Sequence, residues 1–147
     1  MKTTNLFPPK TFPESYLHDR PWMLVLPGTP ADYYSLEEAK ADYYNGMIAY
    51  HSPASPLHES VTAKLLAQIL VFAQQRNAGE VYGSNLAVAL GQGYIFMPDV
   101  TFIAKGNPGS FSRTEFTGVP EIVVEVQSPS TAQHDLHTKR PAYQAAG

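Results

Sequence analysis

The sequence predicts a mixed α/β domain, in which a mixed β-sheet is flanked by helices, and three observations support this prediction. Asn45-Gly46 lies between aromatic and β-branched residues, which is the strongest short-range signal for a β-hairpin. A helical hydrophobic repeat follows over about 57–77. The residues after it change to the strand period. Because helix and strand patterns alternate, we expect the long helix to pack on the sheet.

Composition limits the class of protein. The chain has 147 residues, enough for one domain, and contains no cysteine, which excludes disulfides, thiolate zinc sites and a cysteine nucleophile. Its formal charge of -3 supplies no broad basic face for a phosphate backbone. No apolar run approaches the roughly 20 residues that span a bilayer, and the N-terminus lacks the pattern of a signal peptide. We therefore expect a cytoplasmic protein without membrane contact.

The N-terminal part combines an arm, a short helix and the hairpin. Residues 1–34 are rich in proline, which predicts an extended arm, since proline fixes φ and removes a hydrogen-bond donor. Ser35 and Glu38 form a capping-box pattern, which predicts a short helix to about Asp42. The hairpin then covers 42–51, and Ser55 is placed to cap the long helix.

The C-terminal part alternates strands with a last helix. Strand periods predict four strands, over 81–84, 86–90, 94–104 and 122–127. A last helix is predicted over about 135–146, although Pro141 would lose a hydrogen bond and clash inside a helix. The chain ends at Gly147, where a further strand would be the usual sequel. We therefore expect the domain, 35–147, to be truncated at its C-terminus.

Two acidic residues stand among apolar residues of the predicted strands. Asp99 would share a strand face with Ile95, Met97 and Ile103, where burying a lone carboxylate is costly. It therefore needs a partner. A backbone hydrogen-bond network or a salt bridge would explain its burial just as well as a functional ligand would. Glu125 alternates with valines, and a strand with one solvated face explains this pattern equally well.

A second polar group lies on the last predicted helix. Asp135, Lys139 and Tyr143 are spaced by four residues and so share one helix face. An ordinary ion pair at the start of a helix also explains Asp135 and Lys139. His134 and His137 could bind a transition metal together with Asp99 or Glu125, but surface histidines are the simpler interpretation.

Taken together, these residues resemble the PD-(D/E)xK nuclease superfamily, and in detail its Uma-type branch of restriction-endonuclease-like proteins. The resemblance runs from about residue 35 to the end and depends on an ordered set rather than on one motif. The set consists of Tyr44-Asn-Gly-Met-Ile48, Ser52-Pro53 with His58, Pro98-Asp99-Val100, Pro120-Glu-Ile-Val-Val-Glu125-Val, Ser128-Pro-Ser-Thr131, Asp135, Lys139, Tyr143 and Gly147.

The resemblance implies a restriction-endonuclease-like core in which Asp99 and Glu125 lie on neighbouring strands and bind Mg²⁺ or Mn²⁺. The lysine of the superfamily normally stands two residues after the glutamate, where this chain has Gln127. In the Uma-type branch the lysine has moved to the following helix, so Lys139 would take its role. The resemblance and the helix face together give four accessory candidates, His58, Glu59, Asp135 and Tyr143.

The chemistry of this site follows from its donor atoms. Hard cations favour oxygen ligands and keep several waters, so two carboxylates and the Val126 carbonyl could hold one ion. The predicted activity is Mg²⁺-dependent hydrolysis of DNA phosphodiester bonds by an endonuclease, and two cuts in a duplex would suit a homodimer. Two alternatives stay open. One is an inactive binding module on the same fold, which Gln127 and Pro141 favour, and the other is a metal-dependent hydrolase of small phosphoesters.

Overall fold

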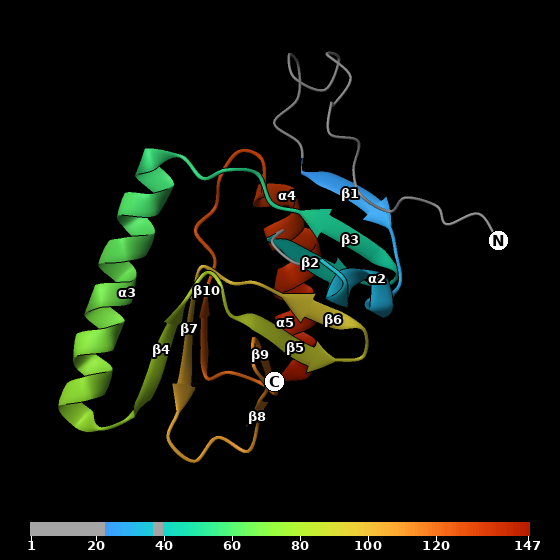
Figure 1. Ribbon diagram of the computed structural model, residues 1–147. Coiled ribbons are helices and arrows are strands. Elements are labelled where there is room, and N and C mark those ends of the chain that lie inside the picture. Colours follow the sequence, from blue (N-terminus) through green and yellow to red (C-terminus); the bar gives the residue numbers. More distant parts are fainter. Residues whose placement is uncertain (1–22, 37–39) are drawn as a thin grey trace.

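Two β-sheets organise the protein in the computed structural model, which describes residues 23–36 and 40–147 (Figure 1). The larger sheet has the strand order β1-β3-β2-β6-β5-β9-β8, and the smaller has the order β10-β7-β4. The strands are β1 (Leu24–Pro27), β2 (Ala41–Tyr44), β3 (Met47–Tyr50), β4 (Gly79–Gly83), β5 (Ala87–Gly91), β6 (Tyr94–Phe96), β7 (Val100–Ala104), β8 (Ser110–Phe111), β9 (Glu115–Thr117) and β10 (Ile122–Val124). The helical segments are α2 (Pro30–Tyr34), α3 (Pro56–Arg76), α4 (Ala132–His134), the π-helical η1 (Asp135–Lys139) and α5 (Arg140–Ala146).

The predicted fold class is confirmed. The larger sheet is mixed, because β5 and β9 run parallel while its other strand pairs are antiparallel. The predicted hairpin is also confirmed, and Asn45 and Gly46 adopt left-handed φ values of 48° and 81°, as its turn requires. The hairpin lies inside the larger sheet, since β2 also pairs with β6 and β3 also pairs with β1.

The long helix is confirmed and packs on the smaller sheet. The Ser55 side chain accepts a hydrogen bond from the His58 backbone N–H at 3.2 Å, which starts α3 as expected. The helix ends at Asn77, whose φ of 50° forms the left-handed cap, rather than at Gly79. Figure 1 shows α3 lying along β4 and β7, so the two ends of the helix reach opposite ends of this sheet.

The predicted helix from Ser35 to Asp42 is wrong. The helix in this region is α2, whose N-cap is Thr29, six residues before the predicted cap. Thr29 and Asp32 form the capping box that the sequence analysis assigned to Ser35 and Glu38, and Pro30 starts the helix at its favoured first position. Ser35 is the C-cap of α2. Residues 37–39 lie outside the described residues, and Asp42 belongs to β2.

The described end of the predicted proline-rich arm belongs to the sheet and to a helix instead. Strand β1 pairs with β3 along its length, from Leu24 opposite Tyr50 to Pro27 opposite Met47. Residues 24–34 therefore belong to the folded domain, and the apolar residues of β1 gain a sheet neighbour. The first 22 residues of the predicted arm lie outside the described residues.

The predicted strand 94–104 is two strands in different sheets. β6 belongs to the larger sheet and β7 to the smaller, and Met97-Pro98-Asp99 crosses between them. The backbone N–H of Met97 donates to the Asp42 carboxylate at 2.7 Å, and Pro98 has no N–H to give a neighbouring strand. Asp99 therefore lies at the crossing and not on the face of a continuous strand. The predicted strand 122–127 likewise ends at Val124.

The last helix accommodates Pro141 by changing its winding. The expected helix consists of α4, η1 and α5, and the Arg140 N–H bonds to the Asp135 carbonyl five residues back. This wider turn places Pro141 in the first turn of α5, where a missing N–H is tolerated. The predicted clash inside a regular helix does not arise.

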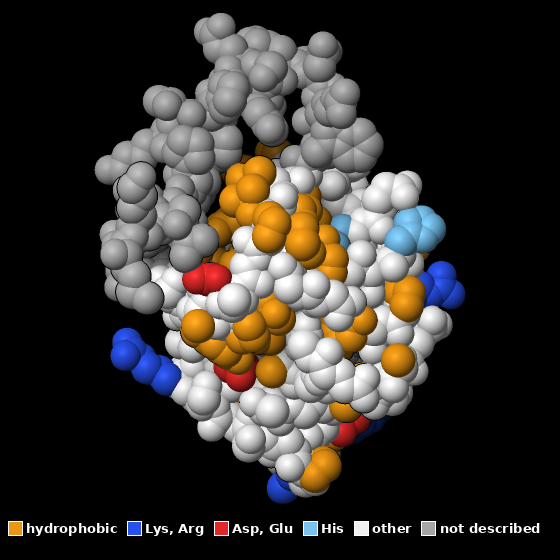
Figure 2. Space-filling model, turned by 90° about the vertical axis from the view of Figure 1, so that its right-hand side faces the viewer, with side chains coloured by type: hydrophobic (Ala, Val, Ile, Leu, Met, Phe, Trp, Pro, Cys, Tyr) orange, Lys and Arg blue, Asp and Glu red, His pale blue; other side chains and the backbone are white. Residues whose placement is uncertain are grey.

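On the surface opposite the long helix, the described residues form no basic stripe. Figure 2 shows hydrophobic side chains gathered in patches on this face, with Lys and Arg side chains at its margins. No helix in the described part of the chain is long and apolar enough to cross a bilayer.

Candidate active site

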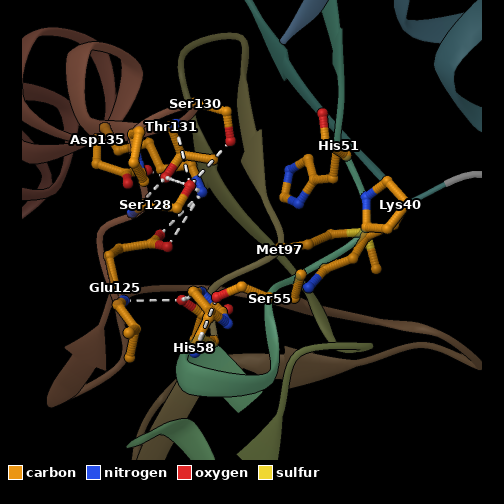
Figure 3. A pocket seen from close by; sticks show the side chains of 17 residues that line it. Lys40, His51, Ser55, His58, Met97, Glu125, Ser128, Ser130, Thr131 and Asp135 are labelled. Carbon is orange, nitrogen blue, oxygen red and sulfur yellow. Dashed lines mark hydrogen bonds and ion pairs between the residues drawn. The ribbon is translucent and has the colours of Figure 1, made fainter. Parts of the chain in front are cut away.

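A cavity of about 270 Å³ lies where the chain crosses from the larger to the smaller sheet (Figure 3). Five segments line it: the end of the hairpin, the start of α3, the crossing, the chain after β10, and the last helix. In Figure 3, Glu125 and Asp135 lie on one wall, while Lys40 and His51 lie on the opposite wall. Segments far apart in the sequence therefore bring ionisable groups together at this point.

Asp99 reaches the cavity from the crossing and is only 7% exposed. Its Oδ2 accepts a hydrogen bond from the Val126 backbone N–H at 2.7 Å and one from His58 Nε2 at 3.2 Å. The Val126 backbone amide and the His58 imidazole are thus the partners that the burial of Asp99 requires. Among the described residues, none donates a hydrogen bond to Oδ1, so this oxygen retains its lone pairs for a ligand.

Glu125 follows β10 directly and faces the last helix. Its two oxygens each lie 3.1 Å from Lys139 Nζ, and Oε1 also accepts a hydrogen bond from the Tyr143 hydroxyl at 2.8 Å. Burial raises the pKa of Glu125 to about 7; the nearby Lys139 ammonium opposes this rise, and the Asp42 and Asp135 carboxylates add to it. Glu125 is therefore poised to exchange a proton near neutral pH.

Lys139 lies on η1 and is 3% exposed. Besides Glu125, its Nζ contacts Asp42 Oδ2 at 3.1 Å and Asp135 Oδ1 at 3.7 Å. Burial alone would lower its pKa, but the three carboxylates hold the pKa of Lys139 above its usual range. It stays an ammonium at neutral pH, with no lone pair to accept a proton. Its chemistry is thus charge compensation rather than deprotonation of a water.

Asp42 is the site residue that the sequence analysis missed. This residue of β2 has no exposed surface, and its Oδ2 lies 2.9 Å from His51 Nε2 and 3.1 Å from His134 Nε2 and Lys139 Nζ. Burial would raise the pKa of Asp42, but Lys139 and the two histidines hold it well below its usual range. The signal was present, because Asp42 is an acid between Ala41 and Tyr43 in a strand.

Several predicted residues lie away from the cavity or have other partners. Gln127 is exposed and does not line the cavity, and the Glu59 side chain is 69% exposed. The interpretation of His134 as a surface residue is wrong, because its side chain is buried with Nε2 hydrogen-bonded to Asp42, and it does not line the cavity that holds Asp99 and Glu125. His137 is exposed, as expected. Within the described ranges, no three histidine, aspartate or glutamate residues form a metal-binding group.

The donor atoms that remain fit a hard divalent cation. Three carboxylates, from Asp42, Glu125 and Asp135, surround the Lys139 ammonium, and the Asp99 carboxylate lines the same cavity, so negative charge is in excess around this ammonium. Asp99 Oδ1 is free of hydrogen bonds from described residues, and a carboxylate such as Glu125 offers about four lone-pair positions. Mg²⁺ and Mn²⁺ need few protein oxygens because they keep part of their water shell. The residues present therefore fit such an ion.

A mixed sheet flanked by helices, with an acidic cavity at a strand crossing, defines a restriction-endonuclease-like protein. The chain belongs to the Uma2 family, whose model matches residues 30–147 and bears the description "Putative restriction endonuclease". This match confirms the family that the sequence motifs indicated, and it supports a nuclease. Families with this fold usually use divalent metals. No curated protein matches the chain.

Proposed function

We propose that this protein is a Mg²⁺-dependent endonuclease that hydrolyses phosphodiester bonds in DNA. One observation carries the proposal: the Asp99 and Glu125 carboxylates and the Lys139 ammonium converge on one cavity from three separate segments. Acidic oxygens beside a fixed ammonium suit metal-assisted phosphoryl transfer, since the oxygens can hold a metal ion and the ammonium offsets charge on the phosphate.

Each residue of the site has a distinct role in this proposal. Asp99 and Glu125, with the Val126 carbonyl, would hold the cation, which when bound polarises a phosphoryl oxygen and acidifies a water. Lys139 offsets the negative charge that develops on the phosphate. Tyr143 fixes the Glu125 carboxylate through its hydroxyl, and His58 fixes the Asp99 carboxylate through Nε2.

The proposal of DNA as substrate rests on the family and not on bulk charge. A formal charge of -3 gives no general attraction for a phosphate backbone. We therefore expect binding to depend on the bound cation and on Lys40 at the cavity wall. A homodimer would deliver the two cuts that a duplex needs, and its product would be linear DNA rather than a nicked circle.

Cleavage of a supercoiled plasmid tests the proposal, because only an endonuclease can open a closed circle. The wild type is compared with Asp99→Asn and Glu125→Gln in Mg²⁺, in Mn²⁺ and in EDTA. We expect each variant to lose on the order of 100-fold or more in rate, and EDTA to abolish cleavage. Glu80→Gln, which changes an exposed acid on β4, is the matched control and should retain the full rate. Equal rates in all four proteins would refute the assignment.

A second function, a nuclease-fold module that binds without cutting, is favoured by one observation. Both oxygens of Glu125 already contact Lys139, and one also accepts the Tyr143 hydrogen bond. Calorimetric titration with Mn²⁺ separates the two functions. Heat that disappears in Asp99→Asn favours the nuclease, whereas no heat from the wild type favours the module. Hydrolysis of a chromogenic phosphodiester without plasmid cleavage would instead indicate a small-phosphoester hydrolase.

A further inference from the structure

Asp42, on strand β2 of the hairpin, contacts both the Lys139 ammonium and the chain segment that leads to Asp99. We propose that Asp42 is a positioning residue that sets the locations of Lys139 and Asp99 for catalysis, an inference that rests on the nuclease function proposed above. Its two carboxylate oxygens have different partners. Oδ2 pairs with the Lys139 ammonium, and Oδ1 accepts a hydrogen bond from the Met97 backbone N–H.

The contact with Oδ2 fixes the position of the Lys139 ammonium. Lys139 Nζ lies 3.1 Å from Asp42 Oδ2 and 3.1 Å from both oxygens of Glu125, so the two acids hold one ammonium between them. A lysine side chain has several rotatable bonds, so holding its ammonium in one place costs rotamer entropy that fixed partners must offset. Asp42 has no exposed surface, whereas the Glu125 side chain is 16% exposed. Asp42 is therefore the more rigid of the two anchors.

The contact with Oδ1 fixes the position of Asp99. The Met97 N–H donates to Asp42 Oδ1 at 2.7 Å, where a strand would have used a neighbouring carbonyl. Only Pro98 separates Met97 from Asp99, and its ring fixes φ. The hydrogen bond thus determines where the chain leaves the larger sheet and where the Asp99 carboxylate enters the cavity.

The surroundings of Asp42 distinguish this role from simple satisfaction of a buried charge. His51 and His134 also approach Oδ2, at 2.9 Å and 3.1 Å, so Asp42 has more partners than charge neutrality needs. Its remaining partners are the Lys139 ammonium and the backbone N–H of Met97, which lies two residues before the candidate metal ligand Asp99. A purely structural acid would affect stability, whereas a positioning residue must also affect turnover.

Asp42→Asn and Asp42→Glu test the proposal in the full chain. Asparagine can still accept from Met97 but removes the charge beside Lys139, and glutamate keeps the charge but displaces it. In plasmid cleavage with Mg²⁺ we expect kcat to fall about 100-fold in Asp42→Asn with KM within about threefold, and to fall less in Asp42→Glu. The control is Glu121→Gln, whose acid also accepts a backbone N–H, from Ala104, but lies outside the cavity. An unchanged kcat in a folded Asp42→Asn protein would overturn the proposal.

A double-mutant cycle shows whether Asp42 acts through Lys139. We expect Asp42→Asn combined with Lys139→Met to be no slower than Lys139→Met alone, because both changes remove the same placed ammonium. Additive losses would contradict the proposed route. If Asp42→Asn does not fold, two other proteins test the proposal: the double variant, which removes both buried charges, and Asp42→Glu. In that case, full kcat in Asp42→Glu would overturn the proposal.

A spectroscopic readout separates this inference from the nuclease function itself. In protein labelled with ¹⁵N-lysine, an ammonium shielded from water and held by carboxylates gives a visible N–H correlation. We expect this signal for Lys139 in the wild type and in Glu121→Gln, and its loss in Asp42→Asn. If the wild type cuts no DNA but the signal behaves in this way, the nuclease proposal fails while the positioning of Lys139 by Asp42 stands. A signal unchanged in Asp42→Asn would refute the positioning.

Discussion

Glu125 is the side chain whose environment most directly predicts a pH effect. It faces the Lys139 ammonium, the Asp42 and Asp135 carboxylates and the Tyr143 hydroxyl. Burial raises its pKa from 4.5 to about 7 in the folded protein, against the opposing effect of Lys139. Between these two values the folded state binds a proton that the unfolded state does not. The free energy of unfolding must therefore decrease as the pH rises through this window.

Urea denaturation in EDTA, at several pH values from 5 to 8, measures this effect. We expect wild-type stability to fall over the window relative to Glu125→Gln, by an amount on the order of 2–3 kcal/mol. Glutamine is neutral at every pH, so it removes this proton and leaves the histidines to titrate equally in both proteins. Parallel stability curves for the two proteins would show that Glu125 is ionised throughout.

The sequence revealed acids in strands but not their partners. Asp99 and Glu125 were recognisable because carboxylates among apolar strand residues need compensation. Asp42 carries the same signal, but the overlapping capping pattern at Ser35 assigned it to a helix end. That His134 and Lys139 share one carboxylate could not be predicted, since the hairpin and the last helix meet only through tertiary packing.

Among the elements, the last helix shows how local winding and site geometry depend on each other. A π-helical turn adds a residue to one turn, and η1 is the turn that carries both Asp135 and Lys139. Regular α-helical spacing puts these two residues on one face, as the sequence analysis expected. The wider turn keeps Asp135 Oδ1 3.7 Å from Lys139 Nζ and at the same time accommodates Pro141.

Thermal denaturation of Pro141→Ala tests this account of the helix. Because Pro141 lies in the first turn of α5, we expect its replacement to change the free energy of unfolding by about 1 kcal/mol or less. Ala145→Pro, an exposed position late in the same helix, is the comparison and should cost about 3 kcal/mol. A large change in Pro141→Ala would mean that the proline imposes the π-turn rather than fitting into it.

Strands were predicted well where the chain stays in one sheet and poorly where it changes sheets. The apolar pattern of 94–104 is continuous, so periodicity alone gave one strand. The break depends on the hydrogen bond from Met97 to Asp42, which is 55 residues away in the sequence. β8 and β9 were missed because strands of two and three residues leave too short a pattern to detect.

At the scale of the molecule, the two candidate metal ligands meet at one end of the smaller sheet, where the chain arrives from the larger one. Asp99 directly precedes β7 and Glu125 directly follows β10, and these two strands pair with Val100 opposite Val124. The Asp42 and Asp135 carboxylates repel the Glu125 carboxylate, and all three contact the one Lys139 ammonium. A divalent cation would relieve this repulsion only in the folded protein, because the unfolded chain does not bring the ligands together. Binding should therefore stabilise the whole fold.

The melting temperature in Mn²⁺ measures this coupling without requiring any nuclease activity. At a Mn²⁺ concentration about 100 times the dissociation constant, linkage adds about 2.7 kcal/mol, which for a chain of this length corresponds to roughly 5–10 °C. We expect the shift at pH 8, where Glu125 is ionised, and its loss in Asp99→Asn and Glu125→Gln. Glu80→Gln should keep it. A wild type whose melting temperature ignores Mn²⁺ would show that the folded protein does not bind the ion, and an equal shift in all the variants would place the metal elsewhere, because loss of a true ligand must reduce the stabilisation that binding supplies.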